Sequence, residues 1–143
     1  MQELFDVISA AGLKLTPRRR SIVALFAESG NPLSPRDVHS RLRPLFSRCG
    51  LPGVYRNLDA LAGCGLLFRL AGSGRERLYA LCRMPAGHHH HIVCVSCGKT
   101  GTVDSCQYHE GMMVGGFRLL SHAAHFEGIC PACHQASTGG VRT

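Results

Sequence analysis

Residues 88–97 read HHHHIVCVSC, four histidines followed by a Cys-x-x-Cys pair, and a second pair, Cys130 and Cys133, comes near the C-terminus. Four adjacent histidines form no apolar face for a helix or a strand, whereas imidazole and thiolate groups are common metal ligands. Two residues between paired cysteines allow both sulfurs to reach one ion. Cys94 and Cys97, together with the second pair, therefore predict a closed tetrahedral site for structural Zn²⁺.

Alternation of side chains along an extended strand divides the histidine run between two faces. His89 and His91 are expected on one face and His88 and His90 on the other, so one short run can serve two metal sites. Cys82 lies shortly upstream and is a candidate soft ligand for one face, which favours Zn²⁺ over iron or manganese. A small buried thiol without a metal is the alternative for Cys82.

Basic residues are concentrated in the first part of the chain. The 143 residues carry a net charge of +7; residues 1–83 hold 13 Lys and Arg against 6 Asp and Glu, whereas residues 84–143 hold 3 of each. A basic half favours a polyanion such as double-stranded DNA, with a solvated basic surface as the alternative.

Composition restricts the class of protein further. The hydrophobic content of 45% supports a packed core, and no apolar run approaches the ~20 residues that a membrane span needs. The N-terminus has no signal-peptide pattern. We therefore expect a cytoplasmic protein without a membrane partner, in which the eight cysteines are metal ligands or buried thiols and not disulfides.

Start signals and apolar spacing predict three or four helices in the first half. They are expected over residues 2–11, from Thr16-Pro17 to Gly30, from Ser34-Pro35, and from Leu51-Pro52 to about Gly63. Two short apolar runs, residues 66–70 and 77–81, flank a Gly-Ser-Gly turn and predict a hairpin. Helices followed by a hairpin are the order of a winged helix-turn-helix, whose last helix enters the major groove.

The second half is expected to be a smaller α/β unit. Strands are predicted over residues 92–94, 100–103 and 117–123, with a weak amphipathic stretch over residues 106–116 between the last two. The fold class is α/β in the α+β sense. The predicted domains are a winged-helix DNA-binding domain over residues 1–82, a hinge over 83–87, a metal-binding domain over 88–134 and a loose tail over 135–143.

Four segments together resemble the ferric uptake regulator family of bacterial metal-dependent repressors, over about residues 4–134. They are residues 15–19 (LTPRR), 54–58 (VYRNL), 88–99 (HHHHIVCVSCGK) and 128–133 (GICPAC). The resemblance implies a homodimer with an N-terminal winged helix and a C-terminal α/β dimerisation domain. Such a dimer would bind an inverted-repeat DNA operator.

The resemblance also implies which residues contact DNA. Tyr55 and Arg56 would do so from the fourth helix, and Lys14 and Arg19 near the DNA backbone or the minor groove. This fits the chemistry of the groove, because arginine can take guanine bidentately and tyrosine can pack on a thymine methyl group. An ordinary Tyr-Arg pair on a helix surface is the alternative.

Two histidine-containing metal sites follow from the same resemblance. Cys82, His89 and His91 match the sensing site of zinc uptake regulators. A further site in the dimerisation domain would be held by three histidines, which are His88, His90 and His122. Its fourth ligand is usually acidic in the family, and in this chain the corresponding position is His109 or Glu110.

Three positions depart from the family pattern. Pro32 stands where iron and peroxide sensors have histidine, and Thr102 stands where most members have a carboxylate. Both departures disfavour an iron or manganese site. Phe68 stands where some zinc sensors have aspartate, which leaves the sensing site one ligand short; Asp104, Glu76 or a water are the alternatives for it.

These observations predict a zinc-responsive repressor and not an enzyme. An iron- or peroxide-sensing member that uses Fe²⁺ or Mn²⁺ is the alternative within the family. A zinc deaminase would need a His-x-Glu sequence, of which His125-Phe126-Glu127 is one, and a zinc hydrolase would need a general base such as Glu110 or Glu127. A zinc-ribbon interaction module explains the paired cysteines but not Tyr55-Arg56. Cys49, Cys64 and Cys106 are expected to be buried thiols, with a redox role as the alternative.

Overall fold

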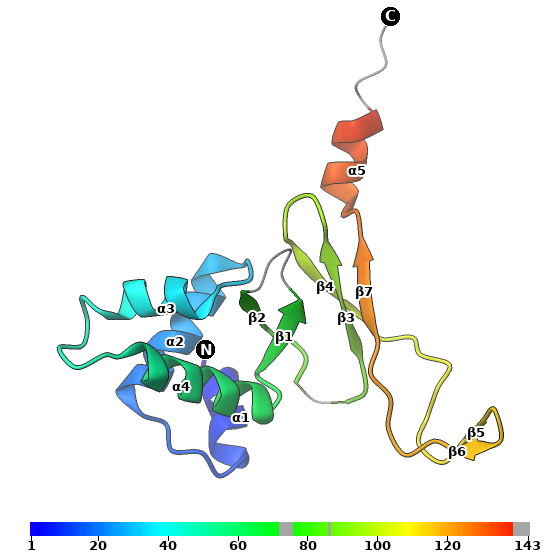
Figure 1. The fold of residues 1–143 in the computed structure, drawn as a ribbon, viewed down its shortest axis with the longest axis horizontal. Helices are drawn as coiled ribbons and strands as arrows, with labels where there is room; N and C mark the ends of the chain where they lie inside the picture. Colours follow the sequence, from blue (N-terminus) through cyan, green and yellow to red (C-terminus); the bar gives the residue numbers. More distant parts are fainter. Residues whose placement is uncertain (72–75, 86, 139–143) are drawn as a thin grey trace, which may run out of the picture. The chain divides into compact units, whose positions relative to one another are not determined.

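The computed structural model describes residues 1–71, 76–85 and 87–138 and contains two compact units, Met1–Ala86 and Gly87–Thr143 (Figure 1). The N-terminal unit consists of α1 (Gln2–Ala10), α2 (Pro17–Ser29), α3 (Pro35–Leu42), α4 (Leu51–Gly63), β1 (Leu67–Ala71) and β2 (Arg77–Leu81). The C-terminal unit consists of β3 (His90–Cys94), β4 (Thr100–Val103), β5 (Met113–Val114), β6 (Phe117–Arg118), β7 (His125–Gly128) and α5 (Pro131–Thr138). Within the described residues, no helix has the length and apolar character needed to cross a bilayer.

The predicted helix starts are confirmed by their caps. The Thr16 side chain accepts a hydrogen bond from the N–H of Arg19 at the start of α2. Ser34 and Asp37 form a capping box at the start of α3, in which each side chain satisfies a backbone N–H of the other. Gly30 ends α2 with a φ of 64°, a left-handed conformation that glycine adopts without steric cost.

We expect Ser34→Ala to lower the free energy of unfolding of the N-terminal unit by about 1 to 2 kcal/mol. Hydrogen bonds from Ser34 lower the pKa of Asp37, and the bond from the Ser34 backbone N–H has the largest effect. The carboxylate therefore stabilises the folded state above a pH of about 4, and this contribution is lost as the pH falls through the folded pKa. Urea titrations at neutral and acidic pH measure both effects. Ser40→Ala on the exposed side of α3 is the control, and an equal loss in both variants would contradict the cap.

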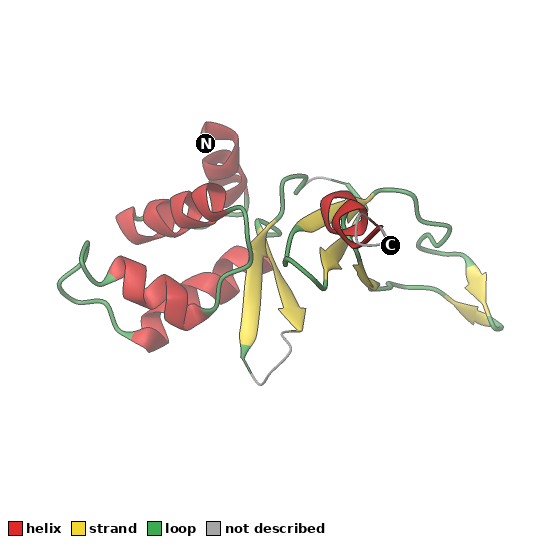
Figure 2. Ribbon diagram, turned by 90° about the horizontal axis from the view of Figure 1, so that it is seen from above, coloured by secondary structure: helices red, strands yellow, loops and turns green. Residues whose placement is uncertain are grey.

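The core of the N-terminal unit lies between the helices and the β1–β2 hairpin (Figure 2). Its fully buried side chains include Ile8, Ile22, Phe26, Leu42, Leu58, Leu61, Leu66 and Tyr79. Burial of each aliphatic side chain of this size stabilises the fold by about 1.5 to 3 kcal/mol. Apolar burial is therefore a main source of stability for this unit.

Strand β2 connects the hairpin to the helices. Tyr79 on β2 exchanges two backbone hydrogen bonds with Leu33, of 2.9 and 3.0 Å, just before α3. Its hydroxyl donates to Asp59 of α4 at 2.7 Å, and Arg69 of β1 donates to the same carboxylate at 2.9 Å. These bonds lower the pKa of Asp59, and the bond from Tyr79 has the largest effect. Helices α1 to α4 with this hairpin form the predicted winged helix, and α4 is tied to both strands of the hairpin.

The C-terminal unit is built on a three-stranded sheet of order β4-β3-β7. Strand β3 pairs with β4 antiparallel and with β7 parallel. Ile92 at the centre of β3 faces Gly101 and Gly128 on the two neighbouring strands. A Cβ at either glycine would lie 3.2 to 3.3 Å from the Ile92 side chain. The two glycines therefore allow Ile92 to lie flat across the sheet.

The C-terminal unit has almost no apolar core of its own. Among residues 87–137, whose burial the structure describes, only His90 and Cys94 are buried, at 6% and 4% exposure. Phe117 and Leu120, by contrast, are 79% and 73% exposed. A unit of this size that buries so little apolar surface needs a metal or a partner to be stable.

One strand prediction for this unit is wrong. The strand expected over residues 117–123 is reduced to the short β6, and the third strand of the sheet is β7, His125–Gly128. Strand β7 escaped prediction because its polar sequence, His-Phe-Glu-Gly, carries no apolar run; its pairing with β3 defines it. The amphipathic stretch over residues 106–116 contains the short strand β5.

The loose tail was expected to begin after His134, but α5 continues to Thr138. The helix starts at Pro131, and proline at a first helical position was a usable signal that the prediction overlooked. The rest of the expected tail, residues 139–143, lies outside the described residues. So does the Gly-Ser-Gly turn of the predicted hairpin, within residues 72–75.

Candidate metal centres and DNA-binding face

The four paired cysteines meet at one end of the sheet. Cys94 ends β3, Cys97 lies in the following turn, and Cys130 and Cys133 lie at the start of α5. Their sulfurs all lie within 4.8 Å of one another, and Cys97 and Cys130 are 3.7 Å apart. Sulfurs bound to one tetrahedral Zn²⁺ at about 2.3 Å stand about 3.8 Å apart. The arrangement is therefore compatible with a structural zinc site.

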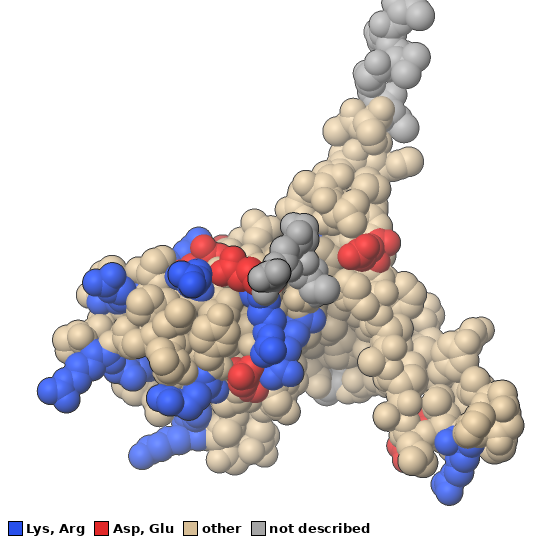
Figure 3. Space-filling model, viewed as in Figure 1, with Lys and Arg blue, Asp and Glu red and all other residues tan. Residues whose placement is uncertain are grey.

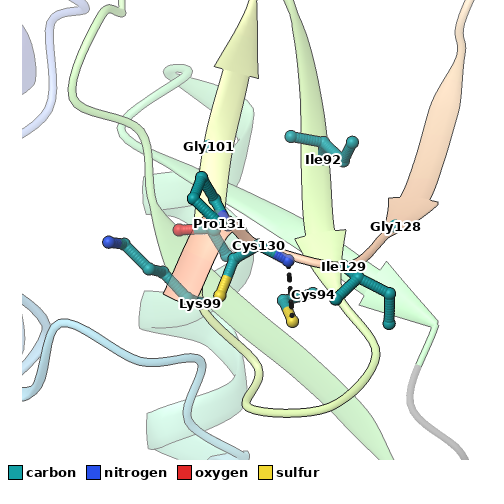
Figure 4. A pocket seen from close by; sticks show the side chains of 9 residues that line it. Ile92, Cys94, Lys99, Gly101, Gly128, Ile129, Cys130 and Pro131 are labelled. Carbon is teal, nitrogen blue, oxygen red and sulfur yellow. Dashed lines mark hydrogen bonds between the residues drawn. The ribbon is translucent and has the colours of Figure 1, made fainter. Parts of the chain in front are cut away.

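Backbone groups hold these cysteines in place. The N–H of Cys130 donates to Cys94 Sγ at 3.2 Å, as the dashed line in Figure 4 shows. The N–H of Gly98 donates to the Cys94 carbonyl at 2.9 Å, which closes the turn that carries Cys97. The two cysteine pairs thus come from segments that are far apart in sequence. The hydrogen bond from the Cys130 N–H to Cys94 Sγ joins these segments.

The pKa values of Cys94 and Cys133 are shifted in opposite directions. Backbone N–H groups, that of Cys130 first, lower the pKa of Cys94 to about 6. The hydrogen bond with Cys130 raises the pKa of Cys133 to about 12. The thiolate of Cys94 thus forms readily, whereas ionisation of Cys133 is unfavourable. A divalent cation relieves this resistance because it neutralises neighbouring thiolates.

A pocket of about 210 Å³ lies beside Cys94 and Cys130 (Figure 4). Its other lining residues are Ile92, Lys99, Thr100, Gly101, Gly128, Ile129 and Pro131. This lining contains no carboxylate or imidazole that could act as a general base on a metal-bound water. The lining of the pocket beside Cys94 and Cys130 is therefore compatible with a closed structural site.

The histidine run divides as strand alternation predicts. The rings of His88 and His90 are 4.8 Å apart, and so are those of His89 and His91. Burial is the main cause that lowers the pKa of His90. Burial, followed by the charges of His89 and His90, lowers the pKa of His91 to about 4. Both imidazoles are therefore neutral at neutral pH, which is the form that binds a metal.

The predicted further site gains a residue that the sequence analysis left without a role. His90 Nε2 lies 3.1 Å from His122 Nε2 and 3.3 Å from Cys106 Sγ, and the Cys106 and His122 atoms are 3.2 Å apart. With His88, these residues offer four ligand atoms within 4.8 Å of one another.

The predicted fourth ligand of this site differs from the observed arrangement. His109 and Glu110 lie outside the group and line the adjoining pocket. His109 Nδ1 bonds the Glu110 carbonyl at 3.2 Å. Sequence reasoning missed Cys106 because it belongs to no Cys-x-x-Cys pair and the loop between it and His122 carries no motif.

The expected ligands of the sensing site are distributed over both units. Cys82 follows β2 in the N-terminal unit, where its N–H donates to the Leu66 carbonyl at 2.9 Å. Burial raises the pKa of its thiol. His89 and His91 belong to the C-terminal unit.

The residues expected to contact DNA share one region of the N-terminal unit. Tyr55 and Arg56 follow one another on α4, where Arg56 is exposed. Arg19 of α2 donates from Nε to Asn57 of α4 at 3.1 Å and from a terminal nitrogen to the Lys14 carbonyl at 2.6 Å. Asn57 therefore links the predicted contact residues, a role that its place in the quoted motif did not reveal.

Positive charge is concentrated on the N-terminal unit. Figure 3 shows Lys and Arg side chains at several places on the visible face of the helical unit, with a few Asp and Glu among them. Phosphate groups of DNA are attracted by such a surface whatever the base sequence. A winged helix with a basic helix surface, joined to a unit with clustered Cys and His residues, defines a metal-dependent transcription regulator.

Comparison with known proteins identifies the family. The model of the Ferric uptake regulator family matches residues 10–127. A ferric uptake regulation protein of Synechococcus elongatus is 32% identical over 138 residues, which cover 90% of this chain and 91% of the relative. A zinc uptake regulation protein of Mycobacterium tuberculosis is 34% identical over 130 residues, 88% of this chain and 98% of the relative. The chain therefore belongs to the ferric uptake regulator family.

Solved structures agree with this assignment. A zinc uptake regulator complexed with zinc and DNA has a TM-score of 0.74 over 96% of this chain and 94% of that chain. At 22% identity this likeness shows the fold alone. The ferric uptake regulator of Francisella tularensis with iron is 28% identical, with a TM-score of 0.54 over 86% of this chain and 96% of that chain.

Proposed function

We propose that this chain is a zinc-responsive repressor that binds an inverted-repeat operator as a homodimer and catalyses no reaction. The observation that carries the choice of metal is the donor chemistry. Cysteine and histidine dominate the candidate sites, whereas Pro32 and Thr102 occupy the positions at which the resemblance expects histidine and carboxylate ligands for iron. Thiolate and imidazole ligands favour Zn²⁺.

The paired cysteines would hold a structural Zn²⁺. The 3.7 Å separation of Cys97 and Cys130 and the absence of a general base in the lining of the adjoining pocket support this role. Zinc at this position would join the end of β3 to α5. Because the unit buries so little apolar surface, binding energy at this site would contribute directly to folding.

The proposed sensing ligands are Cys82, His89 and His91. Cys82 lies three residues beyond Tyr79, whose hydroxyl bonds Asp59 of α4. A metal held by Cys82 and the two histidines would restrict the hinge over residues 83–87 and thereby the position of α4 relative to the dimer. Zinc and DNA would then be linked ligands, each of which increases the affinity for the other.

The same hypothesis assigns the exposed apolar surface of the C-terminal unit to a second copy of the chain. Met113, Phe117, Leu120 and Ile129 are between 49% and 79% exposed. A homodimer would cover apolar surface that the isolated unit leaves in water. It would also present two α4 helices to the two halves of an operator.

The proposal is tested by Cys82→Ser. We expect this variant to remain folded and dimeric but to lose at least tenfold of its zinc-dependent affinity for DNA. The probe is a duplex selected from a random library by the zinc-loaded wild type, and the readout is a gel-shift titration in zinc buffers. Cys64→Ser replaces a half-buried thiol of the same unit that donates to the Leu61 carbonyl, and serves as the control.

Two outcomes would contradict the proposal. An unchanged zinc dependence in Cys82→Ser would remove Cys82 from the sensing site. Recovery of DNA binding with Fe²⁺ or Mn²⁺ but not with Zn²⁺ would favour the iron- or peroxide-sensing alternative within the family.

A further inference from the structure

The fourth ligand of the predicted further site is still open, and the cluster of His88, His90, Cys106 and His122 bears on it. Three of its pairs lie at 3.1 to 3.3 Å. Ligands of one tetrahedral Zn²⁺ stand about 3.3 Å apart for two nitrogens and about 3.6 Å apart for nitrogen and sulfur. The ligand atoms therefore lie at nearly the distances from one another that they would have around one bound Zn²⁺.

The cluster has the geometry and access that a metal site needs. His90 is 6% exposed and its Nε2 lies within 3.3 Å of both Cys106 Sγ and His122 Nε2. His88 is exposed and Cys106 and His122 are half-buried, so an ion can enter from the adjoining pocket, which these three residues line. The group contains no carboxylate, so the Cys106 thiolate would be the anionic ligand of a bound ion.

The place of the two loop-borne ligands gives the cluster a mechanical role. Cys106 and His122 lie immediately before and after residues 107–121, the segment that contains β5 and β6. No residue of this segment is buried. Its described backbone hydrogen bonds include Gly111 N–H to the Leu119 carbonyl and Leu119 N–H to the Met112 carbonyl, both within the segment. Apolar packing therefore contributes little to holding it on the sheet.

We propose that Cys106 completes a three-histidine, one-cysteine zinc site that fastens both ends of residues 107–121 to β3. The ion would be bound by two residues of the histidine run and by the two ends of the loop. Closing a loop in this way removes conformational freedom that the segment does not lose through packing. Zinc would thus order the hairpin that carries the exposed Met113 and Phe117. The soft donor set favours Zn²⁺ over Fe²⁺ or Mn²⁺.

The test uses the full-length protein with zinc alone as the probe. We expect Cys106→Ser to lose one zinc per chain in native mass spectrometry, or to bind that zinc at least tenfold more weakly. Zinc should slow amide hydrogen exchange in residues 107–121 of the wild type and have no such effect in the variant. His109→Ala tests the other candidate ligand, and Cys49→Ser replaces a half-buried thiol outside every cluster. Both should behave as the wild type does.

A second measurement needs no variant. In the wild type, zinc should slow alkylation of Cys106 by iodoacetamide at least tenfold, as read by peptide mass spectrometry, and should leave Cys49 unaffected. Equal alkylation of Cys106 with and without zinc would overturn the proposal. So would an unchanged zinc content and affinity in Cys106→Ser, or loss of the zinc in His109→Ala instead. Cys82→Ser should leave the hydrogen exchange of residues 107–121 and the alkylation of Cys106 unchanged, so this site and the proposed sensing site can fail independently.

Discussion

Replacing Cys97 with serine is expected to unfold the C-terminal unit and to leave the N-terminal unit folded. Cys97 is exposed, so the substitution removes little packing. Its effect should come through the proposed zinc site, where apparent binding free energies are about 10 to 16 kcal/mol. Loss of one thiolate ligand would remove a substantial part of this, comparable with the whole stability of a domain, about 5 to 15 kcal/mol. The two buried residues of the unit, His90 and Cys94, cannot compensate.

Hydrogen exchange resolved along the sequence measures this directly. Amides of β3, β4 and β7 should lose protection in Cys97→Ser, and amides of α2 and α4 should keep it. Removal of zinc from the wild type by a strong chelator should reproduce the pattern. Ser96→Ala, an exposed neighbour in the same turn, is the matched control. Protection of the three strands at the wild-type level in zinc-free Cys97→Ser would show that the unit folds without a metal.

Arg56→Ala is expected to reduce operator affinity on the order of a hundredfold or more without changing stability. Arg56 is exposed on α4, beside Tyr55. A bidentate contact to guanine discriminates by about 1 to 3 kcal/mol, and a dimer would lose one such contact at each half-site. Every 1.4 kcal/mol corresponds to about tenfold in affinity. The variant should also lose preference at one base position per half-site, because phosphate contacts would remain.

A charge-matched control separates base recognition from general attraction. Arg36→Ala removes an exposed arginine from α3 and should weaken binding only slightly and equally across sequences. Fluorescence anisotropy at a stated salt concentration, followed by selection from a random duplex library, measures affinity and preference. Equal losses in the two variants, with preference retained in both, would mean that Arg56 does not read bases.

Much of the N-terminal unit could be predicted because its signals are local. Thr16 and Ser34 each precede a proline, and both cap helices as expected. The paired cysteines could be predicted for the same reason, since a two-residue spacing suffices to bring two sulfurs together. Alternation along β3 likewise predicted the division of the histidines.

The features that escaped prediction depend on contacts between distant segments. Strand β7 is defined by its parallel pairing with β3 and not by its own composition. Cys106 lies beside His90 and His122 because the loop between residues 106 and 122 returns to the sheet, and nothing near Cys106 in sequence indicates this return. Asn57 acquires its link to Arg19 only when α2 packs beside α4.

The zinc titration proposed for Cys82→Ser tests the central claim most directly when it is carried out on the wild type. Affinity for the selected duplex is measured across a series of zinc buffers, with bound zinc per chain determined in the same samples. The account predicts that affinity falls at least tenfold when the sensing zinc leaves while the paired cysteines still hold theirs, and that Zn²⁺ alone restores it. Affinity that stays constant across this range, or that only Fe²⁺ or Mn²⁺ restores, would contradict the account.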